Sequence, residues 1–84
     1  MTVKELREQL KDFNDDDIVV VSKDGEGNDF SLLADLGQDM YVASSTWSGE
    51  IYPREYDEQY FMDREEYEEV KAEAQKCVTL WPAN

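Results

Sequence analysis

The run Ile18-Val19-Val20-Val21 is the most strongly apolar segment of the chain. Consecutive apolar residues of this kind are typical of a β-strand that is covered on both faces. We therefore expect Ile18 to Ser22 to form a central strand, with a helix on one side of it. No apolar run approaches the roughly 20 residues that cross a bilayer, so no membrane partner is expected.

A helix is predicted ahead of this strand. Thr2 and Glu5 have the spacing of a capping box, in which each side chain binds the backbone N–H of the other residue. Apolar residues then recur at steps of three and four, which places them on one helix face that we expect to meet the core: Val3, Leu6, Leu10 and Phe13. Asn14 is expected to end the helix.

Two further strands are expected after a turn at residues 23–29, namely Phe30 to Leu36, closed by Gly37, and Met40 to Ser44. Hairpin pairing is expected among these first three strands. Residues 44–61 resemble a loop, because small polar residues open the segment and Pro53 interrupts it.

The end of the chain predicts one more helix and one more strand. Asp63 can cap a helix over residues 64–75, with Glu66 as its reciprocal partner. Residues 77–81 then read as a strand that stops at Pro82.

This order predicts an α+β fold: two helices and a small, mostly antiparallel sheet of about four strands, in the order α-β-β-β-α-β. The 84 residues are expected to form a single domain, 1–84, with an acidic second half over residues 50–73. The expected core brings together Leu6, Leu10, Phe13, Val20, Leu80 and Trp81. Because so small a core leaves little surplus over conformational entropy, dimerisation stays open.

Carboxylates dominate the charge of the chain. Asp and Glu number 21 against 8 Lys and Arg, which gives a net charge of −13. Ten acids and three basic residues lie between Glu50 and Glu73, so this stretch carries 3 − 10 = −7. Direct binding to nucleic acid is disfavoured, because DNA carries about one negative charge per 1.7 Å. A basic protein that handles DNA or RNA is the expected partner.

Glu65, Glu69 and Glu73 follow one another at four-residue steps, so they share one helix face. A row of carboxylates on a rigid helix can imitate a phosphate backbone, or it can be a solvated face that only keeps the protein soluble; both readings remain open. Aromatic residues are interleaved with the acids. We expect Tyr60, Phe61 and Tyr67 to pack the helix onto the sheet, and Trp47, Tyr52 and Tyr56 to be exposed anchors. The expected partner-binding residues are Trp47, Tyr52, Glu55, Tyr56, Asp57, Glu58, Glu65, Glu66, Glu69 and Glu73.

Most catalytic and metal chemistry is not expected. The chain contains no His, so it lacks Ser-His-Asp and Cys-His pairs and His metal ligands. Its single cysteine, Cys77, cannot form an internal disulfide, which favours a reducing cytoplasm, and the first residues lack the order of a signal peptide. Residues 24–35 resemble a calcium loop but read better as a hairpin turn, because Asp29 replaces its essential glycine. No cofactor, metal or catalytic residue is therefore predicted, and an enzyme is the weakest reading.

The opening Thr2-Val3-Lys4-Glu5-Leu6, the 18–21 strand and the terminal Val78-Thr79-Leu80-Trp81-Pro82 resemble small acidic proteins encoded by bacteriophages. The resemblance covers about the first third and the last few residues, and not the acidic middle. Such proteins commonly block host defence or nucleic-acid enzymes, some by imitating DNA, within the host cytoplasm. The resemblance implies an inhibitor of this type. The alternative is a small accessory or structural phage protein, with charge that serves solubility, as a monomer or a homodimer.

Overall fold

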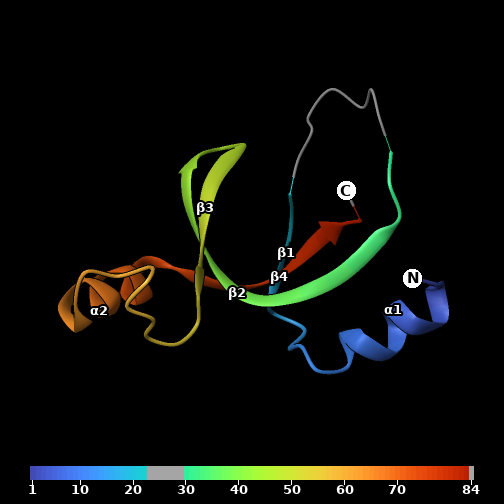
Figure 1. The fold of residues 1–84 in the computed structure, drawn as a ribbon, viewed down its shortest axis with the longest axis horizontal. Coiled ribbons are helices and arrows are strands. Elements are labelled where there is room, and N and C mark those ends of the chain that lie inside the picture. Colours follow the sequence, from blue (N-terminus) through green and yellow to red (C-terminus); the bar gives the residue numbers. More distant parts are fainter. Residues whose placement is uncertain (23–29, 84) are drawn as a thin grey trace.

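The fold combines two helices with one four-stranded sheet (Figure 1). A computed structural model describes residues 1–22 and 30–83 of the chain. The α+β class and the element order predicted from the sequence are confirmed. The elements are α1 (Val3–Leu10), β1 (Ile18–Val21), β2 (Leu33–Ser45), β3 (Ser48–Pro53), α2 (Arg64–Glu73) and β4 (Gln75–Pro82).

The sheet is mixed, with strand order β1-β4-β2-β3. β4 pairs in parallel with β1, whereas β2 runs antiparallel to both β4 and β3. The central position expected for Ile18–Val21 is therefore wrong, since β1 is an edge strand on which Val19 and Val21 are 67% and 61% exposed. The last strand in sequence takes the centre instead, and its residues Cys77, Val78 and Thr79 are buried.

β2 is one long strand rather than the two short ones that were predicted. Gly37, expected to close the first of them, lies inside β2 opposite Thr79. A Cβ at Gly37 would lie 2.5 Å from the carboxylate of Asp39 and 2.9 Å from the indole nitrogen of Trp81. The glycine therefore makes room for the side chains of Asp39 on the same strand and of Trp81 on the neighbouring β4, and it does not end the strand.

The predicted loop at residues 44–61 contains β3, which forms the only adjacent-strand hairpin among the described residues, with β2 as its partner. Hairpin pairing among the first three predicted strands is thus wrong. Gly49 and Pro53 both fit this strand. Gly49 leaves space for the ring of Tyr41, 2.5 Å from its Cβ position, and Pro53 is the last residue of an edge strand, where a missing N–H is tolerated.

α1 begins as predicted but stops early. Thr2 Oγ1 accepts a bond from the Glu5 N–H at 3.1 Å, and the Glu5 carboxylate accepts one from the Thr2 N–H at 3.4 Å, so the capping box is present. The helix ends at Leu10 and not at Asn14. No residue of α1 is buried, and Val3 is 70% exposed, so the expected contact of its whole apolar face with the core is wrong.

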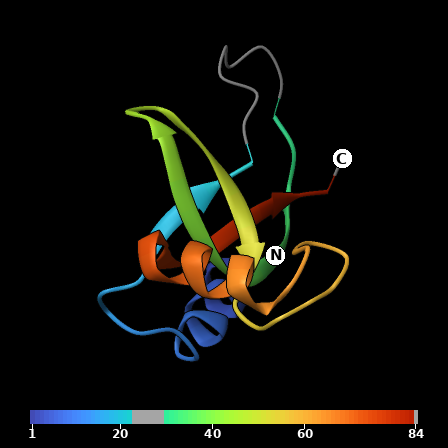
Figure 2. The same cartoon turned by 90° about the vertical axis from the view of Figure 1, so that its left-hand side faces the viewer.

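The core lies at the other end of the molecule, between α2 and β2 (Figure 2). Asp63 caps α2 by accepting a bond from the Glu66 N–H at 2.9 Å, as predicted, although the structure shows no return bond and the helix ends at Glu73. Met40, Phe61 and Tyr67 form the buried cluster. The predicted core is wrong in all its members: Trp81 and Leu10 are 41% and 39% exposed, and the other four are only half-buried, namely Leu6, Phe13, Val20 and Leu80.

Candidate functional site

The glutamates of α2 form an open, negatively charged surface. Glu65, Glu69 and Glu73 are exposed, and their four-residue spacing places them along one side of the helix. We call these three residues the α2 acidic face. Among residues 1–22 and 30–83 the structure has two ion pairs, Lys11–Glu8 and Arg54–Asp17, and neither includes a glutamate of α2. The α2 acidic face is therefore not neutralised within the described part of the chain.

The two basic residues of α2 lie over aromatic rings instead of against these carboxylates. The guanidinium carbon of Arg64 is 4.9 Å from the centroid of the Tyr56 ring, and the ammonium of Lys71 is 5.6 Å from that of Tyr67. Both distances are within the range of cation–π attraction. These contacts occupy both cations of α2 with aromatic rings, and neither cation forms an ion pair with the exposed carboxylates of the α2 acidic face.

A cluster of four aromatic rings supports the helix. Tyr52 and Tyr56 stack on Phe61 at 5.6 and 6.3 Å between centroids, and Phe61 meets Tyr67 edge-on at 5.1 Å. The Tyr67 hydroxyl donates a 2.7 Å bond to the carbonyl of Arg54, which fixes α2 to the end of β3. The cluster holds the helix in a defined position, as a rigid presentation of charge requires.

Two of the three predicted aromatic anchors are therefore not exposed. Tyr52 and Tyr56 are half-buried against the core, because their rings complete the packing around Phe61. Trp47 is 78% exposed in the turn of the β2–β3 hairpin, whose tip points away from α2 (Figures 1 and 2). Tyr60, expected to pack, is 57% exposed, whereas Phe61 and Tyr67 are buried as predicted.

Of the remaining predicted partner-binding residues, some are exposed and others are held in contacts within the fold. Glu55 and Glu58 are exposed in the segment between β3 and α2. The Asp57 carboxylate accepts a 2.8 Å bond from the Gln59 N–H, so it serves a turn. A 2.8 Å hydrogen bond from the Tyr52 phenol to Glu50, and then desolvation, raise the pKa of this phenol. The charge of Glu66, which is half-buried, raises the same pKa by less.

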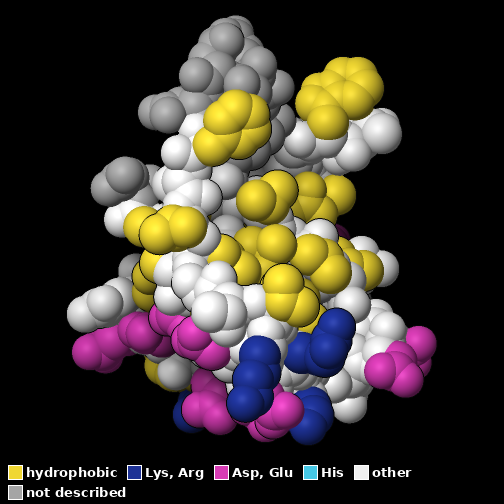
Figure 3. Space-filling model, turned by 90° about the vertical axis from the view of Figure 1, so that its right-hand side faces the viewer, with side chains coloured by type: hydrophobic (Ala, Val, Ile, Leu, Met, Phe, Trp, Pro, Cys, Tyr) yellow, Lys and Arg dark blue, Asp and Glu magenta, His cyan; other side chains and the backbone are white. Residues whose placement is uncertain are grey.

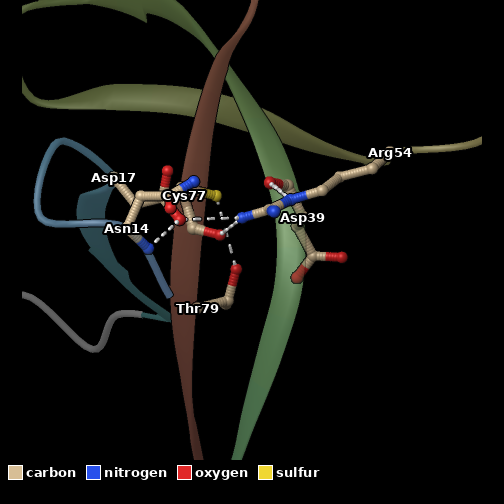
Figure 4. A network of polar contacts seen from close by, with 6 residues as sticks. All are labelled: Asn14, Asp17, Asp39, Arg54, Cys77 and Thr79. Atoms are coloured by element: carbon tan, nitrogen blue, oxygen red, sulfur yellow. Dashed lines mark hydrogen bonds and ion pairs between the residues drawn. The ribbon is translucent and has the colours of Figure 1, made fainter. Parts of the chain in front are cut away.

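Arg54 is a structural residue that the sequence did not reveal (Figure 4). Its Nε donates to the carbonyl of Asp39 on β2 at 2.9 Å, and its Nη2 donates to the carbonyl of Cys77 on β4 at 2.9 Å. Nη2 also lies 3.4 Å from the carboxylate of Asp17, a side chain that is 5% exposed. The guanidinium carbon is 5.9 Å from the centroid of the Phe13 ring. One side chain thus connects the two central strands to the segment between α1 and β1.

The polar network includes the single thiol of the chain, Cys77, which is buried. Burial raises the pKa of the Cys77 thiol above its usual range, and a Thr79 contact at 3.7 Å offsets this only in part, so the sulfur is held as an unreactive thiol. The residues described contain no group of three or more Cys, Asp or Glu placed to hold a metal ion. The calcium-like segment cannot be compared, since residues 24–29 lie outside the described ranges, but Asp35 belongs to β2.

A pocket of about 220 Å³ lies where β2, β3 and β4 meet the segment before α2. It has a single carboxylate in its lining, whereas glycosidase-type acid–base chemistry uses two. The lining residues are Asp39, Ile51, Tyr52, Pro53, Tyr60 and Trp81.

The fold and the surface together define a class: a small acidic α+β domain with a mixed sheet and an uncompensated helix face. No family model, curated protein or solved structure matches the chain. Within the described ranges, neither helix has the length and apolar character needed to cross a bilayer.

Proposed function

We propose that this chain is a non-enzymatic interaction protein whose α2 acidic face binds a basic surface on a protein that handles DNA or RNA. The observation that carries the proposal is the absence of internal ion pairs to the α2 glutamates within the described residues, combined with the cation–π contacts of Arg64 and Lys71. Carboxylates that are already solvated and unpaired gain the most from a basic partner, because no internal pair has to break.

The spacing of the three glutamates supports imitation of a phosphate chain. Four residues of α-helix advance about 6 Å, so the α2 acidic face presents three charges over about 12 Å along one line. The aromatic cluster below the helix fixes this line relative to the sheet. A rigid row of charges binds a nucleic-acid groove more favourably than a flexible acidic tail does. The rigid row loses less conformational entropy on binding, because it is already ordered.

A role as a phage inhibitor of a host enzyme or defence complex follows from the resemblance of the first third of the chain to phage-encoded proteins. Inhibition of this kind needs occupancy of the partner's nucleic-acid groove and no chemistry of its own. The competing reading, an accessory protein whose charge serves solubility, requires no partner for the α2 acidic face. The experiment below separates the two.

The test compares two variants with the same change in charge. Replacing Glu65, Glu69 and Glu73 with Gln removes three charges from the α2 acidic face and relieves like-charge repulsion within the helix, so the fold is retained. The matched control replaces three exposed acids that precede β1 with their amides: Asp12, Asp15 and Asp16. Partners are captured from bacterial lysate on the immobilised wild-type chain and then purified.

The association rate of the captured protein is measured with the wild-type chain, the Gln variant and the control variant. We expect the Gln variant to associate at least roughly tenfold more slowly and the control to change little, because steering depends on where the charge lies. Duplex DNA should compete with the wild-type chain for the captured protein. Equal association rates for wild type and the Gln variant, or no competition by DNA, would refute the mimicry and leave solubility as the role of these acids.

A further inference from the structure

β1 leaves one edge of the sheet open and apolar. The strand consists of Ile18–Val21, and its neighbour on one side is β4, whereas no strand of the described residues pairs with its other side. Natural sheet edges are commonly protected by charged residues, proline or a bulge. The opposite edge, β3, carries such features in Glu50 and Pro53. β1 carries none of them, and two of its valines are mostly exposed.

The hydrogen bonding of the parallel pair shows which backbone groups of β1 are available. The Ser22 N–H donates to the Leu80 carbonyl at 3.3 Å, and the register pairs Val21 with Leu80. Because peptide groups alternate in direction along a strand, Val20 faces β4 in the same way as Ser22 does. The N–H and C=O groups of Val19 and Val21 therefore point out of the sheet.

We propose that the open edge of β1 binds β1 of a second copy of this chain, in an antiparallel pair with its two-fold axis at Val20. In this register Val19 of one copy lies opposite Val21 of the other. These two residues have the outward-facing peptide groups, so each of the two symmetric pairs forms two hydrogen bonds and the dimer gains four. The two sheets then continue as one eight-stranded sheet.

The edge favours a second copy over an unrelated protein. Val19 and Val21 lie on the same face of β1, and the two-fold axis brings four valines together on that face, where like residues are their own complement. No charged side chain on the strand selects a different partner. Because the same strand of both copies meets across the two-fold axis, the interface is isologous. Such an interface is complete with two copies and does not lead to open fibres.

The distribution of charge also favours this contact. Residues 1–22 contain three basic and six acidic residues, 3 − 6 = −3, compared with −7 for residues 50–73. α2 packs on β2, two strands away from β1, so pairing at β1 keeps the α2 acidic faces off the interface. The side of the molecule away from α2 has hydrophobic side chains at its centre, with basic and acidic side chains mixed below them (Figure 3). Pairing at β1 therefore joins two acidic chains through a segment that carries less negative charge than α2 and the residues before it.

The oligomeric state tests the proposal. Sedimentation equilibrium of the wild-type chain should give twice the monomer mass of 9.8 kDa at moderate salt. The double variant Val19→Lys, Val21→Lys brings like charges face to face, and we expect its dimer to dissociate roughly a hundredfold more readily. Val3→Lys is the matched control, because Val3 is equally exposed, at 70%, but lies on α1. This control should leave the dimer intact.

Amide hydrogen exchange locates the contact. In the wild-type dimer the amides of Val19 and Val21 should exchange slowly, and the double variant should expose these two positions while the amide of Val20, which faces β4, stays protected. Protection at Val20 also shows that the variant remains folded. A wild-type chain that sediments as a monomer at every concentration overturns the proposal, and so does a dimer that survives the double variant or that Val3→Lys disrupts equally.

Discussion

Replacing Arg54 with Met should destabilise the fold far more than any other single loss of positive charge on the surface. The guanidinium donates two 2.9 Å bonds to main-chain carbonyls, those of Asp39 and Cys77. Hydrogen bonds from charged donors contribute about 1.5–3 kcal/mol each. Taking the lower value for both gives about 3 kcal/mol. The contact with Asp17 is longer, at 3.4 Å, and the Arg54 side chain is 24% exposed, so we add no more than a few tenths of a kcal/mol for it.

Urea unfolding, followed by far-UV circular dichroism, measures this loss. We expect the midpoint to fall while the slope m is unchanged, because the surface exposed on unfolding is the same. For a domain of this size, about 3 kcal/mol corresponds to a fall of roughly 12–24 °C in the melting temperature. Arg54→Lys should recover only part of the loss, since an ammonium cannot reproduce the planar fork of donors that reaches both strands.

The matched control is Arg64→Met, which removes a cation that also lies over an aromatic ring but that, among residues 1–22 and 30–83, donates no hydrogen bond to the backbone. Its contact, 4.9 Å from the Tyr56 centroid, is exposed, so the expected cost is at most about 1 kcal/mol. If Arg54→Met and Arg64→Met lower the free energy of unfolding by the same amount, the bonds of Arg54 to β2 and β4 do not stabilise the sheet, and the reasoning fails.

Two further predictions concern pH and salt. Because burial raises the pKa of Cys77 above its usual 9.0, the unfolded chain releases this proton first. The contribution of Cys77 to the free energy of unfolding should be constant below about pH 8 and fall as pH rises through 9, and Cys77→Ala, although less stable overall, should lack this fall. A wild-type curve that is flat from pH 8 to 10 would contradict this. The melting temperature should rise by several degrees between about 10 mM and 150 mM NaCl, because salt screens the repulsion between carboxylates. The Debye length falls over this range from about 30 Å to about 8 Å, and the molecule measures 40 × 30 × 23 Å. A melting temperature that does not change with salt would show that the net charge of −13 has little effect on stability.

Local chemistry in the sequence was sufficient to predict where the helices begin. Thr2 with Glu5 and Asp63 with Glu66 are neighbours in the chain, so their hydrogen bonds form whatever the rest of the fold does. The element order and the α+β class followed from these starts and from the apolar runs between them. The end of α1 was less predictable, because the apolar stripe continues to Phe13 although the helix stops at Leu10.

The position of each strand in the sheet could not be read from the same patterns. Ile18–Val21 is apolar enough for a central strand, and only the pairing of β4 with both β1 and β2 shows that it lies at the edge. Gly37 and Pro53 were interpreted as breaks, whereas Asp39 and Trp81, brought over Gly37 by the fold, explain the glycine. The Trp81 contact joins residues that are far apart in sequence, so no local pattern reveals it.

The candidate site shows the same division. The row of glutamates on α2 was predictable from four-residue spacing alone, and the structure confirms that they lie on one exposed helix. The half-burial of Tyr52 and Tyr56 depends on Phe61, which is brought to them by the turn before α2. Arg54 follows a proline in an acidic stretch, and no sequence signal marks it as the residue that joins β2, β4 and Asp17.

The central place of β4 has a consequence for the synthesis of the protein. A ribosome makes β1, β2 and β3 before it makes Gln75–Pro82, and among the described strands β1 pairs with β4 alone. The β2–β3 hairpin can form earlier, but an isolated hairpin is only marginally stable in water. Folding of the sheet must therefore await the last strand, and a nascent chain that stalls before residue 75 exposes Ile18–Val21 to aggregation or proteolysis.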